Sequence, residues 1–326
     1  MTNRDAPSGR ADTPVSGADL ADDVAAASEV VSSVRENVER VIVGNENVIE
    51  HVLTAVLARG HVLLEDVPGV GKTTLARAIA RSFEGEFKRI QFTPDLLPSD
   101  VTGVNVYNKK RNEFEFRHGP VFGNVVLGDE INRAPPKAQS ALLEAMEERQ
   151  VTVDGETRTL PSPFTVIATQ NTVASDHVYD LPMAELDRFT KRLRFGYPEA
   201  TEEIEMLDRI IGEHPLETLA PVVTLGDLKS ARSATSEVTV VEDVRSYATA
   251  LANFTRERAR IGLSPRGTLH LLRSAQARAV IDGRDYVVPD DVKTEAPVVI
   301  PHRIQTGGER SADELVAEAL SATDPE

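Results

Sequence analysis

The sequence contains no cysteine. This absence excludes disulfide bonds, zinc sites built from thiolates and enzymes that use a cysteine nucleophile. The 7 histidines are scattered, and none stands at metal-ligand spacing from other histidines or acids. We therefore expect neither a histidine metal site nor a nucleophile triad.

Positive charge is also scarce. The chain has 36 Lys and Arg residues against 52 Asp and Glu residues, a formal net charge of −16. Such a charge repels phosphate backbones, so binding to nucleic acid is not expected. Lysine is rare and arginine common, which together with the acid excess favours a salt-adapted cytoplasm, as in a halophilic archaeon. An ordinary acidic protein from a GC-rich genome is the alternative.

Long hydrophobic runs are missing too. No apolar run approaches the roughly 20 residues that a membrane-spanning helix needs. The N-terminus is polar and acidic, unlike a signal peptide. We therefore expect a cytoplasmic protein without a membrane span.

The 326 residues are enough for two domains. Residues 1–28 are rich in small and polar residues, which predicts a disordered acidic tail. Over residues 29–197, apolar strands alternate with helical patterns, which predicts an α/β core with a parallel sheet sandwiched by helices. From Pro198 only helical patterns follow, so residues 198–305 predict a small all-α domain and residues 306–326 a loosely ordered tail.

Two hairpins are expected within the core. Residues 104–117 contain two alternating segments separated by a polar, basic tip at 108–112. Residues 151–160 place an Asp-Gly turn, Asp154-Gly155, between β-forming residues, which is a strong hairpin signal.

The segment that organises the core is a glycine-rich turn between a strand and a helix. Gly69 and Gly71 let successive backbone N–H groups point at one anion, and the following helix adds the positive end of its dipole. In such a phosphate loop, Lys72 reaches the β- and γ-phosphates and the Thr73 hydroxyl holds Mg²⁺. The pattern usually opens with Gly, and this chain has Asp66 there. The nucleotide-binding residues are predicted to be Asp66, Val67, Pro68, Gly69, Val70, Gly71, Lys72, Thr73 and Thr74.

Two acids end a later apolar strand. Asp129 is placed to bind Mg²⁺, and Glu130 to orient the water that attacks the γ-phosphate of ATP. Asn171, at the end of the next core strand, could hold the same water. The structural alternatives are two solvent-facing acids and a turn asparagine.

Three arginines are candidates for positive charge against the γ-phosphate. Arg188 and Arg192 follow the last acidic helix-like segment, and Arg266 opens a helix after Ser264-Pro265. For Arg188 or Arg192, an arginine finger can be supplied by a neighbouring subunit, whereas Arg266 could reach across to the phosphate when the two domains close. The alternatives are an ion pair with Asp187 or Glu185 and, for Arg266, an ordinary surface position.

The sequence resembles the MoxR-type AAA+ ATPases over about residues 30–305. It departs from the family pattern between Thr172 and Pro182, before the candidate finger. The runs that carry the resemblance are Leu64–Ala76, Arg89–Asp100, Gly119–Phe122, Asp129–Pro136, Ala168–Asn171, Leu186–Phe189 and Gly283–Asp291.

The resemblance implies an AAA+ P-loop NTPase core followed by an all-α lid, with ATP and Mg²⁺ as ligands. It implies Walker A roles for Lys72 and Thr73, Walker B roles for Asp129 and Glu130, and a sensor 1 role for Asn171. Arg188 would be the arginine finger and Arg266 sensor 2.

It further implies a homo-oligomer, usually a hexameric ring, that hydrolyses ATP and acts as a chaperone-like remodeler. Such proteins assemble or activate partner complexes, including by metal or cofactor insertion, often with von Willebrand A-domain partners. Two alternatives remain open: a nucleic-acid motor or loader that uses the basic tip Lys109, Lys110 and Arg111, and a nucleotide-dependent scaffold without turnover.

Overall fold

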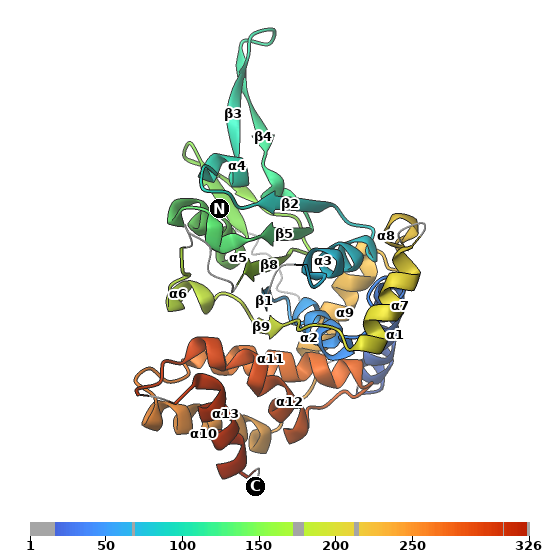
Figure 1. Ribbon diagram of the computed structural model, residues 1–326, viewed down its shortest axis with the longest axis vertical. Coiled ribbons are helices and arrows are strands. Elements are labelled where there is room, and N and C mark those ends of the chain that lie inside the picture. The colour runs from blue at the N-terminus through green and yellow to red at the C-terminus, as the bar shows by residue number, and fades with distance from the viewer. Residues whose placement is uncertain (1–16, 67–68, 172–178, 212–214, 309, 325–326) are drawn as a thin grey trace, which may run out of the picture.

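The computed structural model describes residues 17–66, 69–171, 179–211, 215–308 and 310–324. Its centre is a five-stranded, all-parallel sheet in the order β2-β5-β8-β1-β9 (Figure 1). The α/β architecture expected from the alternating pattern is confirmed. The strands are β1 (Val62–Asp66), β2 (Phe87–Gln91), β5 (Val125–Asp129), β8 (Thr165–Asn171) and β9 (Lys191–Arg194).

Helices cover both faces of this sheet. Because successive strand residues point to opposite faces, Leu63 packs in the hydrophobic cluster that contains Leu142, whereas Leu64 packs in the cluster that contains Leu75. The first face is covered by α5 (Pro136–Glu148) and the short α4 (Pro98–Thr102), the second by α2 (Glu46–Leu57) and α3 (Lys72–Arg81).

The N-terminal prediction needs a correction. Residues 1–28 were expected to be a disordered tail, but helix α1 (Gly17–Glu39) begins inside that range. It lies along α9 (Leu225–Glu237), and Val24 and Ala27 are buried. The many Ala, Asp and Ser residues of this helix obscure the helical spacing of its few larger apolar residues. The sequence pattern therefore predicted a polar tail and not a helix.

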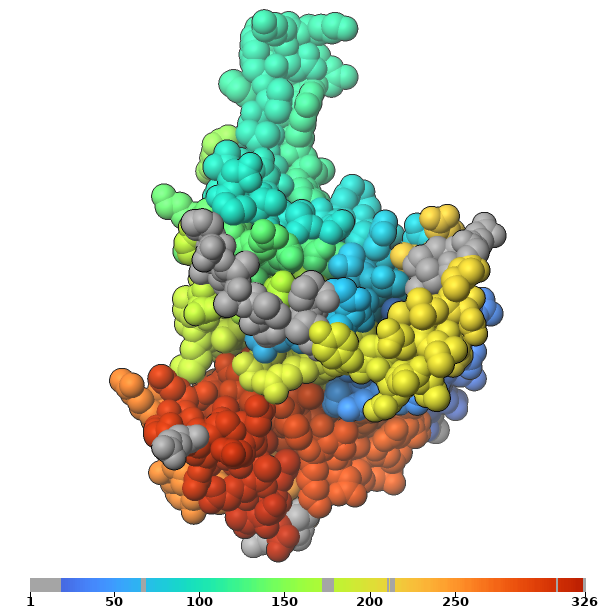
Figure 2. All heavy atoms as spheres, viewed as in Figure 1, coloured from blue at the N-terminus to red at the C-terminus, as the bar shows by residue number. Residues whose placement is uncertain are grey.

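Two hairpins project from the core. Strands β3 (Gly103–Asn108) and β4 (Glu113–His118) form the longer one, which stands out from the body of the molecule (Figure 2). Strands β6 (Gln150–Val153) and β7 (Glu156–Thr159) form the second. The described residues also form three short 3₁₀ turns: η1 (Pro120–Phe122), η2 (Ile131–Arg133) and η3 (Pro301–Arg303).

The C-terminal part is helical, as expected. It contains α10 (Glu242–Arg258), α11 (Pro265–Ile281), α12 (Pro289–Val299) and α13 (Ala312–Ala322). The tail predicted at 306–326 to be loosely ordered is corrected over α13, because Leu315 and Ala319 are fully buried and the helix packs against α10 and α12.

The start of this helical unit also differs from the prediction. Of the helices after Pro198, α7 (Ala200–Ile210), α8 (Pro215–Thr218) and α9 lie beside the core, where α8 contacts α3 and α9 contacts α1 and α2 (Figure 1). The helices that form a separate layer start at α10. Among the described helices, none is both long and apolar enough to cross a membrane.

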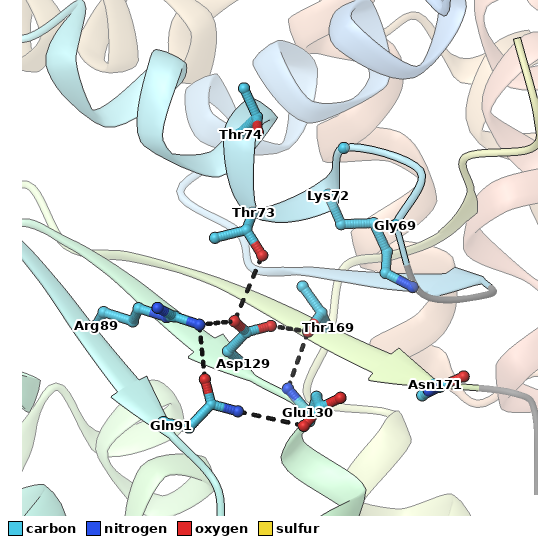
Figure 3. Close-up of a pocket in the computed structure, with 11 residues that line it drawn as sticks. Gly69, Lys72, Thr73, Thr74, Arg89, Gln91, Asp129, Glu130, Thr169 and Asn171 are labelled. Carbon is cyan, nitrogen blue, oxygen red and sulfur yellow. Dashed lines mark hydrogen bonds and ion pairs between the residues drawn. The ribbon is translucent and has the colours of Figure 1, made fainter. Parts of the chain in front are cut away.

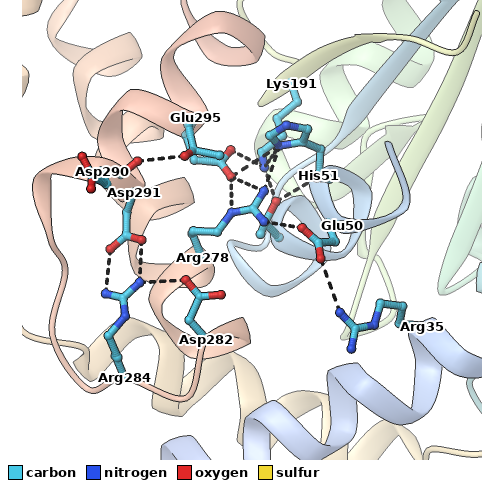
Figure 4. Close-up of polar contacts among 12 residues, drawn as sticks. Arg35, Glu50, His51, Lys191, Arg278, Asp282, Arg284, Asp290, Asp291 and Glu295 are labelled. Atoms are coloured by element: carbon cyan, nitrogen blue, oxygen red, sulfur yellow. Dashed lines mark hydrogen bonds and ion pairs between the residues drawn. The ribbon is translucent and has the colours of Figure 1, made fainter. Parts of the chain in front are cut away.

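A buried polar network joins this helical unit to the core (Figure 4). Lys191 Nζ, from β9, lies 2.5 Å from Glu295 Oε2 of α12, and both side chains are fully buried. Arg278 of α11 binds Glu295 at 3.0 Å and Glu50 of α2 at 2.6 Å. His51 of α2 also contacts Glu295, at 3.4 Å. The buried charges are therefore paired across the junction, which fixes the register between α12 and β9.

Candidate active site

A cavity of about 460 Å³ opens at the carboxyl ends of β1, β5 and β8, beside the first turn of α3 (Figure 3). In parallel α/β sheets, this edge is where ligands bind. The cavity is lined by Gly69, Gly71, Lys72, Thr73, Thr74, Arg89, Gln91, Asp129, Glu130, Thr169 and Asn171.

The glycine-rich turn adopts the backbone that its sequence predicts. Gly69 has φ +90° and Gly71 has φ +100°, conformations that favour glycine. Helix α3 begins directly afterwards at Lys72, and the residues of its first turn, Lys72, Thr73 and Thr74, line the cavity with the N-terminal end of the helix dipole. Val70 packs against the hydrophobic core. Val67 and Pro68 lie outside the described residues.

Asp129 is the centre of the polar contacts in the cavity. Its Oδ2 accepts from Arg89 Nη2 at 2.5 Å and from Thr73 Oγ1 at 3.4 Å, and its Oδ1 accepts from Thr169 Oγ1 at 2.7 Å. The guanidinium of Arg89 balances the charge of the carboxylate. The fold thus brings Thr73 and Asp129, 56 positions apart, into direct contact.

This pair fits a magnesium ion. A hydroxyl and one carboxylate are oxygen ligands of the kind that Mg²⁺ prefers, and Mg²⁺ at phosphate sites is held by few protein groups, with phosphates and water completing the shell. Among the described residues no group of three or more acids and histidines could form a closed metal cage. Thr73 and Asp129 are therefore the residues that would hold it.

Glu130 has an unusual backbone. Its φ of +55° and ψ of +51° lie in the left-handed region, which is uncommon for a residue other than glycine and marks stored strain. The N–H of Glu130 donates to Thr169 Oγ1 at 2.9 Å, and its carboxylate accepts from Gln91 Nε2 at 3.2 Å and Arg133 Nη1 at 2.8 Å. Strand β8 also ends at this cavity, with Asn171 in its lining.

Sequence reasoning missed three members of this cavity. Arg89 and Gln91 come from β2, and Thr169 from β8. Arg89, Gln91 and Thr169 stand within runs that resemble the family, but strand periodicity does not say which side chains reach a carboxylate on the neighbouring β5. Their roles emerge only from the pairing of the strands, which sets Gln91 opposite Asp129.

The three candidate arginines do not line this cavity. Arg188 Nε lies 3.4 Å from Glu147 Oε2, and Arg266 Nη2 lies 2.8 Å from Glu147 Oε1. Arg192 Nε lies 3.7 Å from Glu65 Oε2. Arg188 and Arg266 are therefore brought together at the C-terminal end of α5, away from the phosphate loop of their own chain.

Comparison with known proteins agrees with this geometry. Residues 61–191 match the ATPase family associated with various cellular activities (AAA), and residues 251–321 match the AAA lid domain. The chain is 50% identical over 287 residues to YeaC of Bacillus subtilis, which is described as uncharacterized, covering 87% of this chain and 90% of that protein. It is 41% identical over 294 residues to the chaperone MoxR1 of Mycobacterium tuberculosis, covering 87% and 78%.

A solved structure gives the same result for the fold. The crystal structure of a candidate ATPase from Cytophaga hutchinsonii superposes with a TM-score of 0.86 at 35% identity, covering 93% of this chain and 97% of that one. The core and the lid are thus both shared with a known structure.

Proposed function

The chain belongs to the MoxR-type AAA+ ATPases, and we propose that it hydrolyses ATP to remodel partner proteins during the assembly or activation of their complexes, including metal or cofactor insertion. The observation that carries the ATPase part is the Thr73–Asp129 contact of 3.4 Å beside Lys72 in one cavity. A hydroxyl, a carboxylate and a lysine at a helix N-terminus are the groups that bind a nucleotide triphosphate with its metal.

In this proposal the chain's own residues position the γ-phosphate and a water. The N–H groups at the start of α3 and the Lys72 ammonium bind the phosphates. When bound, Mg²⁺ supplies charge neutralisation at the phosphate oxygens. Glu130 orients the attacking water, and Asn171 holds that water from the neighbouring strand end. Arg89 and Thr169 keep the Asp129 carboxylate in one orientation.

The position of Arg188 and Arg266 supports an oligomeric ring. Neither lines the cavity of its own chain, although transition-state charge on the γ-phosphate calls for a cation. A neighbouring subunit in a homo-oligomeric ring, which we take to be a hexamer, would supply them. Each active site would then form at a subunit interface.

The β3–β4 hairpin is the surface we assign to client proteins. Tyr107 and Phe114 pair across it with ring centroids 5.3 Å apart, and the Phe114 side chain is exposed despite its size. Exposed aromatic residues of this kind mark contact sites. A von Willebrand A-domain protein, in the same cytoplasm of a salt-adapted cell, would be the partner that delivers the client.

A nucleic-acid motor is less well supported. Its candidate element, the tip Lys109–Arg111, is partly neutralised, because Arg111 binds Glu115 at 2.9 Å and Glu113 at 3.9 Å. Together with the net charge of −16, this leaves little positive potential for a phosphate backbone.

The test of nucleotide binding compares two lysines. Lys72→Ala should lose affinity for Mg·ATP by at least about tenfold in calorimetry, since an ammonium contact to phosphate is removed. Lys88→Ala, a control on the exposed part of β2 where Lys88 pairs with Glu86, should bind normally. Equal affinity in both variants would overturn the assignment of the phosphate loop.

The test of remodelling compares two variants of the chain as baits for client proteins in extracts of the same cells. A Glu130→Gln chain, trapped with ATP, should retain client proteins that mass spectrometry identifies, and the added change Phe114→Ser should release them. If both baits retain the same proteins in the same amounts, the hairpin is not the client surface.

A further inference from the structure

A second cavity, of about 360 Å³, lies at the opposite edge of the sheet from the active site. Four arginines from four different places in the chain line it: Arg59 after α2, Arg149 after α5, Arg232 on α9 and Arg273 on α11. Arg232 Nη2 donates to Thr165 Oγ1 at 2.7 Å, at the first residue of β8. Asn171, at the last residue of that strand, lines the active site. The two cavities are therefore about 20 Å apart, the length of a seven-residue strand.

No acid balances these four arginines. The lining contains no Asp or Glu, and among the described residues none of the four forms an ion pair. Other buried arginines of the chain behave differently: Arg278 binds Glu295 and Arg303 binds Asp187. In a chain with 52 acids and 36 bases, an acid-free group of four arginines is not the expected arrangement.

Arg232 is the most constrained of the four. Its side chain is almost fully buried, Nε donates to Val56 O at 2.8 Å, and Nη2 is used by Thr165. Its Nη1 has no partner among the described residues. Burial, with added repulsion from Arg149 and Arg59, lowers the pKa of Arg232 to about 9. Burial and the charges of Arg59 and Arg273 also lower the pKa of Arg149.

Helix ends account for only part of this charge. Arg59 and Arg149 follow the C-termini of α2 and α5, where the helix dipole favours a cation. That effect holds for each arginine alone and does not offset the mutual repulsion of four guanidinium groups around one space. An anion in the cavity would offset it, and would accept from the free Nη1 of Arg232.

We propose that this cavity binds a small anion that carries two or more phosphoryl groups, at a site separate from the ATP site. Guanidinium groups bind phosphoryl oxygens in pairs of parallel hydrogen bonds, so four of them can surround a ligand of three or more negative charges. The volume is within the range of small-ligand pockets. Arg59 and Arg149 belong to the core and Arg273 to α11 of the lid, so the ligand would tie the lid to the core.

The probe for this site is inorganic pyrophosphate. Calorimetry is done on the full chain carrying Lys72→Ala, which weakens phosphate binding at the active site. We expect one pyrophosphate per chain and a rise in melting temperature, since a ligand that binds only the folded state stabilises it. Adding Arg59→Gln and Arg273→Gln should weaken binding at least tenfold. Adding Arg260→Gln instead, an exposed lid arginine without an ion pair, should leave it unchanged.

Four results would overturn the proposal. The first is no measurable pyrophosphate binding at millimolar concentration. The second is binding that survives the paired Arg59 and Arg273 substitutions in a chain that circular dichroism shows to be folded. The third is equal affinity for sulfate, which would mark a general anion site. The fourth is a change of oligomeric state in the arginine variants without any pyrophosphate binding by the parent chain, which would show that the arginines contact an acidic surface of another subunit and not a small ligand.

Discussion

Arg188 and Arg266, which stand 78 positions apart, bind the two carboxylate oxygens of one residue, Glu147, at 3.4 and 2.8 Å. The Arg266 side chain is 52% exposed and the Glu147 side chain 32%, so these ion pairs are screened by water. Exposed pairs of this kind contribute about 0–1 kcal/mol. They are weak enough to be exchanged for a phosphate, and they place both cations on the same surface of the subunit.

The first prediction concerns that surface. Arg188→Ala should bind ATP nearly normally and hydrolyse it poorly, because an arginine finger acts on the transition state and is worth about a thousandfold or more in rate. Mixed with Lys72→Ala subunits, which are also nearly inactive, it should recover part of the activity. In a mixed ring, some interfaces join an intact Lys72 to an intact Arg188.

This experiment needs proof that subunits exchange, which two fluorescent labels provide. If mixed rings form and hydrolysis stays at the level of the two parents, Arg188 does not act across the interface. Arg266 and then Arg192 are the next residues to test by the same mixing.

The second prediction is that Glu130→Gln retains ATP but barely turns it over. The amide keeps the shape of the side chain and loses the charge that orients the water. We expect at least about a hundredfold lower steady-state hydrolysis with ATP affinity within about threefold of the parent chain. Glu144→Gln, an exposed acid on α5, is the matched control. Parent-like turnover in Glu130→Gln would remove this residue from the mechanism.

The third prediction concerns the junction between core and lid. Lys191→Met leaves the buried Glu295 with one charge partner fewer, and should lower the free energy of unfolding by about 3 kcal/mol in urea titrations. The nearby Lys293→Met, whose partner Asp290 is exposed, should change it by less than about 0.5 kcal/mol. Adding Glu295→Gln to Lys191→Met should restore part of the loss. Similar changes in the free energy of unfolding for both lysine variants would mean that the buried ion pair stabilises the fold no more than the exposed one.

The fourth prediction is a loss of stability in acid that His61 causes in part. Val166 N donates to His61 Nδ1 at 2.9 Å, and Nε2 faces Met146 O at 3.2 Å, so the neutral ring satisfies both contacts. Burial, together with the charges of Arg149 and Arg232, lowers the pKa of His61 to about 3 from its ordinary 6.5. Between those values the unfolded chain binds one more proton than the folded chain, so stability falls as the pH falls.

The measurement is the free energy of unfolding at several pH values from 7 to 4. The slope due to one such histidine is at most about 1.4 kcal/mol per pH unit. His61→Gln, which cannot take up a proton, should give a shallower slope by up to that amount. The same slope in both chains would show that His61 does not carry this effect.

Local sequence determined much of this protein. The turn at Gly69–Gly71, the start of α3 at Lys72 and the Asp154-Gly155 hairpin depend on which backbone conformations a few neighbouring residues allow. The strand that ends at Asp129 is set by a short run of buried apolar residues. For these elements, the interactions that decide the structure lie within about ten residues of one another, so a sequence pattern contains them.

Tertiary structure alone decided which distant charges meet. The register of the strands brings Arg89 from one neighbouring strand and Thr169 from the other into contact with Asp129. Glu147 forms ion pairs with both Arg188 and Arg266. Helix α1 packs against α9. The four arginines of the second cavity come from positions 59 to 273. Such contacts depend on how helices and strands that are far apart in the sequence pack together. A local sequence pattern does not specify that packing.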